Sequence, residues 1–446
     1  MNKYTLFLRH AVALIREDKL FSAIYVAGTA VAIASAMVIA IVLNIKLADI
    51  PPESNRSRTL YVSNFLATES VATSQEGTRS GVSTAAIDSV FRQLKCVEVA
   101  TGILSDGQHF MDIANDEQEH VIWGTAMGCD PDFFKLYNLD FISGRPFSEK
   151  EFQGGERVCV VSERIAKKLD GADHFIILDQ ETHPSLHVVG IVKTVSPLME
   201  NARADIYVPY KVEGIGFNPT RQKAQFSYSG NLSVRILLRE GYSREDFLEE
   251  IEPLRQHYNA VISSQAGEKA EWEMLVKTHF FSEINFSHDL TYQSLSDKVE
   301  NLLPPAILML LFLLLPAINL SGLVSNRMEA RRAEMGIRKA FGAKRRELLN
   351  EVINENLVLT LLGGAVGWVL SWLYISVVRN SEVFIQLFFI REQTNWDVSL
   401  DFQMFFTPTL FLIAFLCCAT LNLMAALIPA WASLRKPIVE SLNQKR

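Results

Sequence analysis

The sequence has no excess of positive charge and none of the short motifs that mark common catalytic sites. Its formal net charge is -7, which argues against a nucleic-acid-binding protein, because such proteins usually carry a basic stripe. No GxSxG, HExxH or paired-carboxylate pattern stands out, so nothing indicates an enzyme. His183 and His187 are four residues apart, but Pro184 and the strand-like sequence around them argue against a helical metal site. We therefore expect no catalytic residue, no metal ligand and no cofactor bound by this chain.

Cysteine is also scarce, with five residues in 446. Cys417 and Cys418 fall inside an apolar block, whereas Cys96, Cys129 and Cys159 lie in the more polar part of the chain. Their spacings form neither a CxxC pair nor a zinc pattern. One disulfide among these three stays open if they face an oxidising compartment. Buried free thiols are the interpretation that we favour.

Charged residues and histidine are missing from four long apolar stretches. Crossing the hydrocarbon core of a membrane takes about 20 apolar residues in a helix. We therefore predict four transmembrane helices, at residues 20–45, 302–326, 356–378 and 406–430. The first stretch is longer than the roughly 7–15 apolar residues of a signal peptide, so we expect it to be retained. Uncharged spans argue against a polar path for ions or protons. Pro316 should kink the second span.

Basic residues set the orientation of these spans. Lys and Arg concentrate in residues 1–19, 327–355 and 431–446, whereas residues 379–405 carry few. Cytoplasmic loops are enriched in Lys and Arg, so both termini and the 327–355 loop are expected in the cytoplasm. Residues 46–301 and 379–405 then lie outside. The sequence thus predicts a multi-pass protein of the cell (inner) membrane.

The region 46–301 reads as a mixed α+β domain inserted between the first two spans. Strands are expected at residues 158–161, 186–195 and 231–238, a short helix at 162–169, and a loop at 69–84. Ser243 and Asp246 form a capping-box signal before a helix. The apolar face of that helix is expected to comprise Phe247, Ile251, Leu254 and Tyr258.

The predicted cytoplasmic loop contains a short helix followed by a second one that runs into residues 356–378. Gly342 should end the first helix after Phe341. Ile337 and Phe341 are four residues apart, which places both on one helix face. On these observations alone, the short helix could also lie on anionic lipid at the membrane surface.

The run EMGIRKAFGA at residues 334–343 resembles the EIGIRKALGA-type motif of permeases in the macrolide-exporter/FtsX-like family of ABC transporters. In that family the segment is the coupling helix, which docks into a groove on the nucleotide-binding subunit. Residues 8–40 resemble the family's N-terminal elbow helix, expected at 1–19, and its first span. Residues 144–169, 187–195 and 206–210 are similar to the periplasmic core domain, and ALIPAWASLRKPIVESL at 426–442 resembles the family's ending.

The resemblance implies a permease that works with an ABC ATPase subunit and a second permease chain, identical or related. No GxxxxGK[ST] loop occurs, so ATP is expected to be used by a separate polypeptide. The motif Glu334, Met335, Gly336, Ile337, Arg338, Lys339, Phe341 and Gly342 is expected to couple to the ATPase. Within it, Met335, Ile337 and Phe341 would form the apolar docking face, Arg338 and Lys339 its charged rim, and the glycines would allow close approach and the helix end.

Three functions stay open. The favoured one is export, with movement of the extracytoplasmic domain driven by the ATPase; a periplasmic adaptor or another extracytoplasmic protein stays open as a further partner. The second is a mechanical lever of the same family, as in activation of cell-wall hydrolases or release of lipoproteins, acting on an extracytoplasmic protein. The third is a membrane-anchored sensor without an ATPase, which the short segment after the last span disfavours.

Overall fold

The computed structural model divides the chain into two compact units, residues 46–301 and residues 1–45 with 302–446. It describes residues 19–69, 78–104, 109–114, 121–169, 173–177, 185–196, 199–212, 229–266, 270–278, 331–378 and 408–435, together with 307, 311, 314, 321–322 and 324–329. The expectations for residues 1–18, Pro316, His183, 379–405 and 436–446 fall outside this part of the chain.

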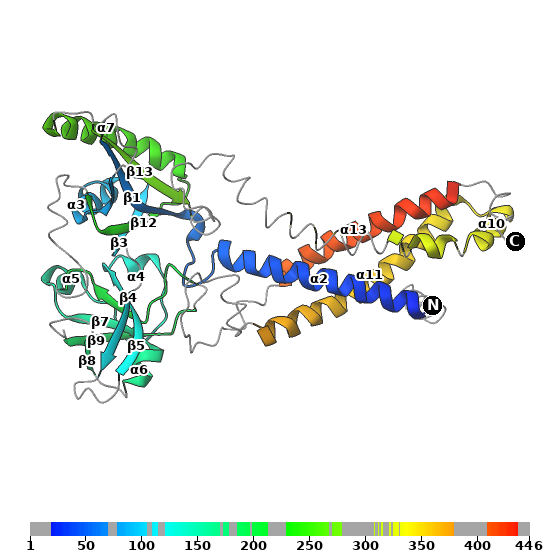
Figure 1. The fold of residues 1–446 in the computed structure, drawn as a ribbon, viewed down its shortest axis with the longest axis horizontal. Coiled ribbons are helices and arrows are strands. Elements are labelled where there is room, and N and C mark those ends of the chain that lie inside the picture. The colour runs from blue at the N-terminus through cyan, green and yellow to red at the C-terminus, as the bar shows by residue number, and fades with distance from the viewer. Residues whose placement is uncertain are drawn as a thin grey trace. The chain divides into compact units, whose positions relative to one another are not determined.

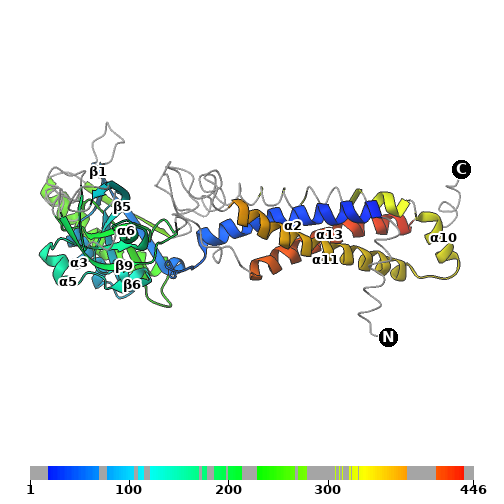
Figure 2. The same cartoon turned by 90° about the horizontal axis from the view of Figure 1, so that it is seen from below.

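The helical unit is built on three long helices that run side by side (Figures 1 and 2). They are α2 (Lys19–Leu47), α11 (Arg345–Val378) and α13 (Pro408–Arg435). Within the described residues, Lys19–Leu47, Arg345–Val377 and Phe411–Ile428 are long and apolar enough to cross a membrane. They agree with three predicted spans, and α13 continues five residues past the predicted boundary at residue 430. The fourth predicted span, 302–326, lies largely outside the described residues.

Small residues bring these helices close together. A Cβ atom added to Gly363 of α11 would lie 2.7 Å from the Cβ of Thr29 in α2, and one added to Gly367 would lie 2.8 Å from the carbonyl oxygen of Ala30. Asn422 of α13 donates to the Thr29 hydroxyl at 3.3 Å. Tyr25 and Thr360 share a hydrogen bond of 3.2 Å between α2 and α11. Small residues therefore allow α2, α11 and α13 to pack closely.

The other unit contains a 13-stranded mixed sheet in two parts. The first part is antiparallel, with the order β3–β12–β1 and with β13 and β2 also paired to β1. Its elements are η1 (Arg56–Arg58), β1 (Thr59–Glu69), β2 (Thr78–Val82), α3 (Thr84–Ser89), η2 (Phe91–Gln93), β3 (Val97–Leu104), β11 (Ser229–Gly230), β12 (Leu232–Leu238), α7 (Arg244–Ala266) and β13 (Ala270–Thr278). The side chains of Phe91 and Phe247 stack between η2 and α7.

The second part closes on itself. Strand β5 pairs with β10, β10 with β7, β7 with β9, β9 with β8, β8 with β4, and β4 again with β5. Closure of this kind leaves those strands without a free edge. Its elements are β4 (His109–Ala114), β5 (Val121–Cys129), α4 (Phe133–Leu136), β6 (Phe141–Gly144), α5 (Glu149–Gly154), β7 (Val158–Ser162), α6 (Glu163–Lys168), β8 (His174–Ile177), β9 (Ser185–Val192) and β10 (Ile206–Pro209). Phe175, Leu186 and Ile206 are fully buried in its apolar core.

Most local predictions for this unit are confirmed. Strands β7, β9 and β12, helix α6 and the Ser243–Asp246 capping box are present, the last with Ser243 donating through its backbone N–H at 2.7 Å. Two predictions are wrong. Residues 78–82 form strand β2 rather than a loop, because their backbone pairs with β1 and a polar composition does not prevent that. Leu254 is 43% exposed, so it does not belong to the buried face of α7.

The three cysteines of this unit are buried free thiols, as the favoured interpretation predicted. Burial raises the pKa of Cys96 to about 12, with the carboxylate of Glu250 adding to the effect. Burial also raises the pKa of Cys159. Thiols in this state are poor nucleophiles at neutral pH, so they contribute packing rather than reactivity.

Candidate functional site

The predicted coupling helix is present as α10 (Arg332–Ala340). Gly342 follows it with a φ of +96°, a conformation that side chains with a Cβ rarely adopt. The N–H of Gly342 donates to the carbonyl of Lys339 and that of Ala343 donates to the carbonyl of Arg338, both at 3.0 Å. These two bonds are the Schellman motif, which satisfies the last carbonyls of a helix. The predicted helix end at Gly342 is therefore confirmed.

Helix α11 begins three residues later and is continuous with the membrane helix. The Glu347 carboxylate accepts from the backbone N–H of Lys344 at 3.0 Å and so fixes the first turn of α11. From there α11 runs without a break to Val378. The prediction that a second helix leads from the loop into the third span is confirmed, and any displacement of its first turn is carried along one continuous helix.

One side of α10 packs inward. Met335 is 9% exposed and belongs to an apolar cluster of the helical unit. Gly336 beside it is also buried. The other members of the cluster are Phe21, Tyr25, Val324, Met328, Leu348, Val352, Leu359, Ala426 and Ala430. The structure thus removes Met335 from the expected docking face, because residues two positions apart, such as Met335 and Ile337, point to different sides of a helix. Met335 anchors α10 to the bundle.

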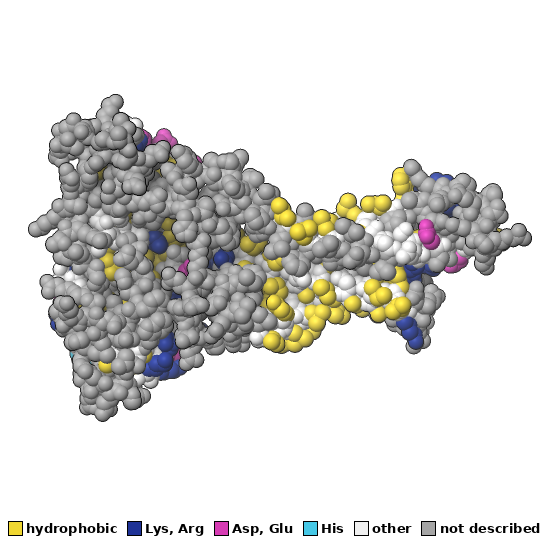
Figure 3. Space-filling model, viewed as in Figure 1, with side chains coloured by type: hydrophobic (Ala, Val, Ile, Leu, Met, Phe, Trp, Pro, Cys, Tyr) yellow, Lys and Arg dark blue, Asp and Glu magenta, His cyan; other side chains and the backbone are white. Residues whose placement is uncertain are grey.

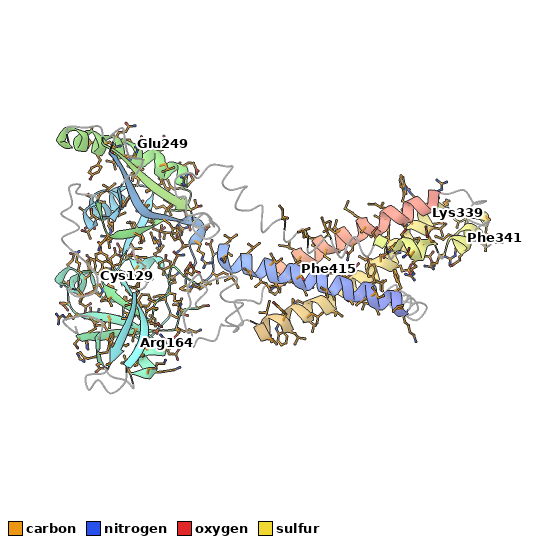
Figure 4. The ribbon with its side chains drawn as sticks, in the orientation of Figure 1. Cys129, Arg164, Glu249, Lys339, Phe341 and Phe415 are labelled. Carbon is orange, nitrogen blue, oxygen red and sulfur yellow. The ribbon has the colours of Figure 1, made fainter. Side chains whose placement is uncertain are left out.

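The other side of α10 exposes two large apolar side chains. Ile337 is 49% exposed and Phe341 is 88% exposed. Figure 4 shows Phe341 at the α10 end of the helical unit, near Lys339. Two large apolar side chains exposed one turn apart on a short helix form a surface suited to bind a groove on a partner. We call Ile337 and Phe341 the exposed pair.

The two basic residues of the motif differ from each other. Arg338 donates to Glu351 of α11 at 2.9 and 3.1 Å and to Glu334 at 2.5 Å. These carboxylates, Glu351 first, raise the pKa of the Arg338 guanidinium. Burial and the neighbouring Arg345 lower the pKa of Lys339. Arg338 therefore ties α10 to α11, and its charge is already balanced inside the chain.

A second ion cluster lies deeper and was not predicted. The Glu355 side chain of α11 is 4% exposed and pairs with both Arg327 and Arg331. Arg331 Nη1 lies 3.1 Å from Glu355 Oε2, and Arg327 contacts the other carboxylate oxygen. The Arg327 guanidinium also lies 4.5 Å from the centre of the Phe21 ring in α2. The only sequence signal was a glutamate one helical turn after Glu351, next to the apolar run.

His187, considered and set aside as a helical metal ligand, lies on strand β9 as its sequence context indicated. Its ring nitrogen Nδ1 is 3.1 Å from Nε2 of His174 on the paired strand β8. Both side chains are exposed on the strand pair.

The chain thus combines helices long and apolar enough to cross a membrane, a large mixed-sheet unit and a short helix in a basic loop. Two family models match the chain in order: a MacB-like periplasmic core domain at residues 22–254 and an FtsX-like permease C-terminal region at residues 306–438. The first covers more than half of the chain. The protein belongs to this family of MacB-like, FtsX-like ABC transporter permeases.

Two curated relatives agree with this family. The chain is 23% identical over 291 residues to the ABC transporter permease YknZ of Bacillus subtilis, covering 64% of this chain and 66% of that one. It is 24% identical over 326 residues to the macrolide export ATP-binding/permease protein MacB of Haemophilus ducreyi, covering 71% of this chain and 40% of that one. Among solved structures, the periplasmic region of MacB from Actinobacillus actinomycetemcomitans matches with a TM-score of 0.31 and 11% identity, over 50% of this chain and 89% of that one. The chain thus spans less than two thirds of the length of these curated relatives.

Proposed function

We propose that this permease couples ATP binding and hydrolysis, on a separate ATPase subunit, to movement of its extracytoplasmic domain for export of the macrolide-exporter type. The protein would lie in the inner membrane with both termini and α10 in the cytoplasm. Two permease chains would work with two ATPase chains, and ATP would be bound by the ATPase alone. The family supports an ATPase as partner; its identity and the exported substrate are matters for experiment.

The observation that carries this proposal is the exposed pair on α10. A short helix that inserts a few apolar side chains into a groove is a common mode of recognition. Ile337 and Phe341 lie four residues apart, one turn along the same face, and are 49% and 88% exposed. The opposite side of α10 is fixed to the bundle through Met335 and the Arg338–Glu351 ion pair. A face that is both apolar and firmly held is suited to transmit force from a partner.

The mechanical path follows from the same contacts. Closure of the ATPase dimer on ATP would displace the exposed pair and with it α10. Since α10 is joined to α11 by the Schellman turn and by ion pairs, the displacement would pass into a membrane helix of 34 residues. The absence of charged groups from the predicted spans fits a lever better than a polar path through the membrane.

Co-purification tests this proposal. The full chain is expressed from its native locus, purified in mild detergent, and its companions are identified by mass spectrometry. We expect an ABC ATPase in near-equal amount, and a loss of at least about tenfold when Ile337→Asp and Phe341→Asp are combined, because losing one anchor worth about 1.4 kcal/mol already weakens binding tenfold.

A matched control places the same change on exposed apolar residues elsewhere. Ile142 and Tyr242 lie in the unit of residues 46–301, which we call the extracytoplasmic unit, and are 55% and 44% exposed. Ile142→Asp with Tyr242→Asp should therefore leave the ATPase bound. Recruitment that survives the α10 variant would refute the docking role. A lipoprotein or hydrolase held by the extracytoplasmic unit would identify the lever function instead of export.

A further inference from the structure

Four segments of the helical unit meet at the carboxylate of Glu355. Arg327 lies in the helical residues 324–329, Arg331 precedes α10 as its N-terminal cap position, Glu355 belongs to α11, and Phe21 of α2 lies under the Arg327 guanidinium. The backbone N–H of Arg331 donates to the carbonyl of Arg327 at 3.1 Å, so the two arginines stand one helical turn apart on one face. Glu355 bridges both of them at once.

A buried charged trio is not needed to hold helices together. Apolar side chains of similar volume often stabilise a buried site equally well, because burying charges requires removing their hydration. A carboxylate between two guanidinium groups, however, fixes the relative orientation of the segments that carry them as well as their separation, since arginine presents its donors in a rigid planar fork. Such a cluster is suited to keep several segments in one arrangement while force passes through them.

The position of Glu355 along α11 is suited to holding these segments together. Glu355 lies two turns before Gly363, at which α11 packs closely against α2, and one turn after Glu351, which pairs with Arg338 of α10. Glu351 and Glu355 therefore form ion pairs at two successive turns on one face of α11, an outer level at Glu351 and an inner level at Glu355. The outer level is about half exposed, at 43% for each partner, and the inner level is buried, at 4% for Glu355. The arginine partners of Glu355 are 24% and 11% exposed, so water competes less with the inner cluster than with the outer pair.

We propose that Glu355 is the positioning residue that locks α10 with Arg331, residues 324–329 and α11 into one body, so that displacement of the exposed pair reaches the membrane helices without being lost in local bending. The source of that displacement rests on the proposed function, whereas the lock itself does not. Glu355 does not touch the partner in this scheme; it acts through Arg331 and Arg327.

The lock is tested first without any partner, by amide hydrogen exchange of the full chain in lipid nanodiscs. Neutralising Glu355 removes the ion pair of Arg327 and leaves Arg331 with the half-exposed Glu334 at 3.5 Å, so Glu355→Gln should raise exchange of α10 amides at least about tenfold. Glu351→Gln is the matched control, with the same change one turn away on the same helix. Because its pair is exposed, exchange should rise less than about fivefold. Glu355→Asp keeps the charge and should restore most of the protection.

Protection of α13 shows whether the variants are folded, and it should be unchanged in all of them. Equal exchange of α10 in the Glu355→Gln and Glu351→Gln proteins would overturn the proposal. So would a Glu355→Asp protein that behaves like Glu355→Gln, since that result would mean that keeping the negative charge does not hold the segments together.

The second arm uses the complex purified with its ATPase. Glu355→Gln should retain the ATPase at the wild-type ratio, because Ile337 and Phe341 are untouched, but should lose the ATP-dependent change in exchange along α11 that the wild-type complex shows. A Glu355→Gln complex with the wild-type ATP response would overturn the positioning role. If no ATPase accompanies the wild-type protein, the proposed function fails, and the first arm still decides on the lock.

Discussion

The two units of this chain place their large apolar side chains in opposite ways. In the extracytoplasmic unit, Phe133, Phe147, Phe175 and Tyr207 are fully buried, and the large apolar side chains described as exposed are Ile142, Tyr242 and Leu254. In the helical unit, apolar side chains gather on the face drawn in Figure 3. They include Trp368, Trp372, Tyr374, Leu412, Leu416 and Trp431. One sequence is thus folded for two solvents, because lipid tails solvate the apolar side chains that water excludes.

The units differ in their polar interiors as well. The extracytoplasmic unit buries complete carboxylate networks: Asp205 accepts from Arg164 at 2.5 Å and from the backbone of Thr125 at 3.0 Å. The helix contacts in the helical unit use neutral groups such as Tyr25, Thr29, Thr360 and Asn422. Among its described residues, a buried carboxylate occurs at Glu355, at the start of the predicted span. Among the described residues, buried carboxylates therefore belong to networks inside the sheet unit, whereas in the helical unit the buried carboxylate lies beside the coupling helix.

The largest loss of stability should come from breaking the Asp205 network. Although burial opposes it, the ion pair with Arg164 holds the pKa of Asp205 below its usual range. Asp205→Ala leaves buried arginine uncompensated and should destabilise the extracytoplasmic unit by about 3–5 kcal/mol. Hydrogen exchange of β5, β7 and β10 measures this loss. The exposed Asp140, changed to Ala, should stay within about 0.5 kcal/mol of wild type. Similar losses in both variants would show that buried charge is not structural here.

A smaller effect should follow from filling the helix contact at Gly363. A Cβ at that position would press on Thr29, so Gly363→Ala should cost about 1–3 kcal/mol and lower the thermal unfolding temperature in detergent. Gly322 provides the control, because a Cβ there has nothing within 4 Å. Gly322→Ala should be neutral or mildly stabilising, since alanine favours a helix by roughly 0.5–1 kcal/mol. An unaffected Gly363→Ala protein would argue that α2 and α11 are not tightly packed.

Acid should weaken the extracytoplasmic unit through Glu151. Its hydrogen bond with Arg145 lowers the pKa of Glu151 to about 2, against burial and helped by Ser148. A lowered folded-state pKa stabilises the fold above the ordinary value of about 4.3 and loses that contribution as the pH falls toward 2. Because Arg145 is 56% exposed, solvent reduces the effect to about 1 kcal/mol or less. The free energy of unfolding of the wild type should exceed that of Glu151→Gln by this amount at pH 7. The difference should shrink between pH 4.5 and 2; a constant difference would exclude the charge as its cause.

The smallest effect is expected at the outer ion pair of the coupling region. Arg338 and Glu351 are each 43% exposed, so Arg338→Gln should cost about 0.2–1 kcal/mol, and less at 1 M salt. Thermal unfolding in detergent at low and high salt measures this. The same variant also addresses the rim role that the motif suggested. Strong loss of the ATPase from Arg338→Gln would show that this guanidinium serves the partner despite its internal ion pairs.

Sequence reasoning reached the features that depend on local pattern. Uncharged apolar runs identified α2, α11 and α13, and Gly342 identified the end of α10, because chain length in the membrane and a positive φ are local requirements. The closed ring of strands was not predicted. It depends on the parallel pairing of residues 206–209 with 126–129, which no single segment encodes. The inward side of Met335 and the Glu355 cluster were missed for the same reason: both are set by partners distant in the sequence.

The central claim is that Ile337 and Phe341 dock an ABC ATPase, and mass spectrometry of the purified full chain tests it most directly. The account predicts an ABC ATPase in near-equal amount with the wild-type protein and with the Ile142→Asp, Tyr242→Asp control, and its loss from the Ile337→Asp, Phe341→Asp variant. An ATPase that remains bound to that variant, or none bound to the wild type in several detergents, would contradict the claim and leave α10 as a helix at the membrane surface.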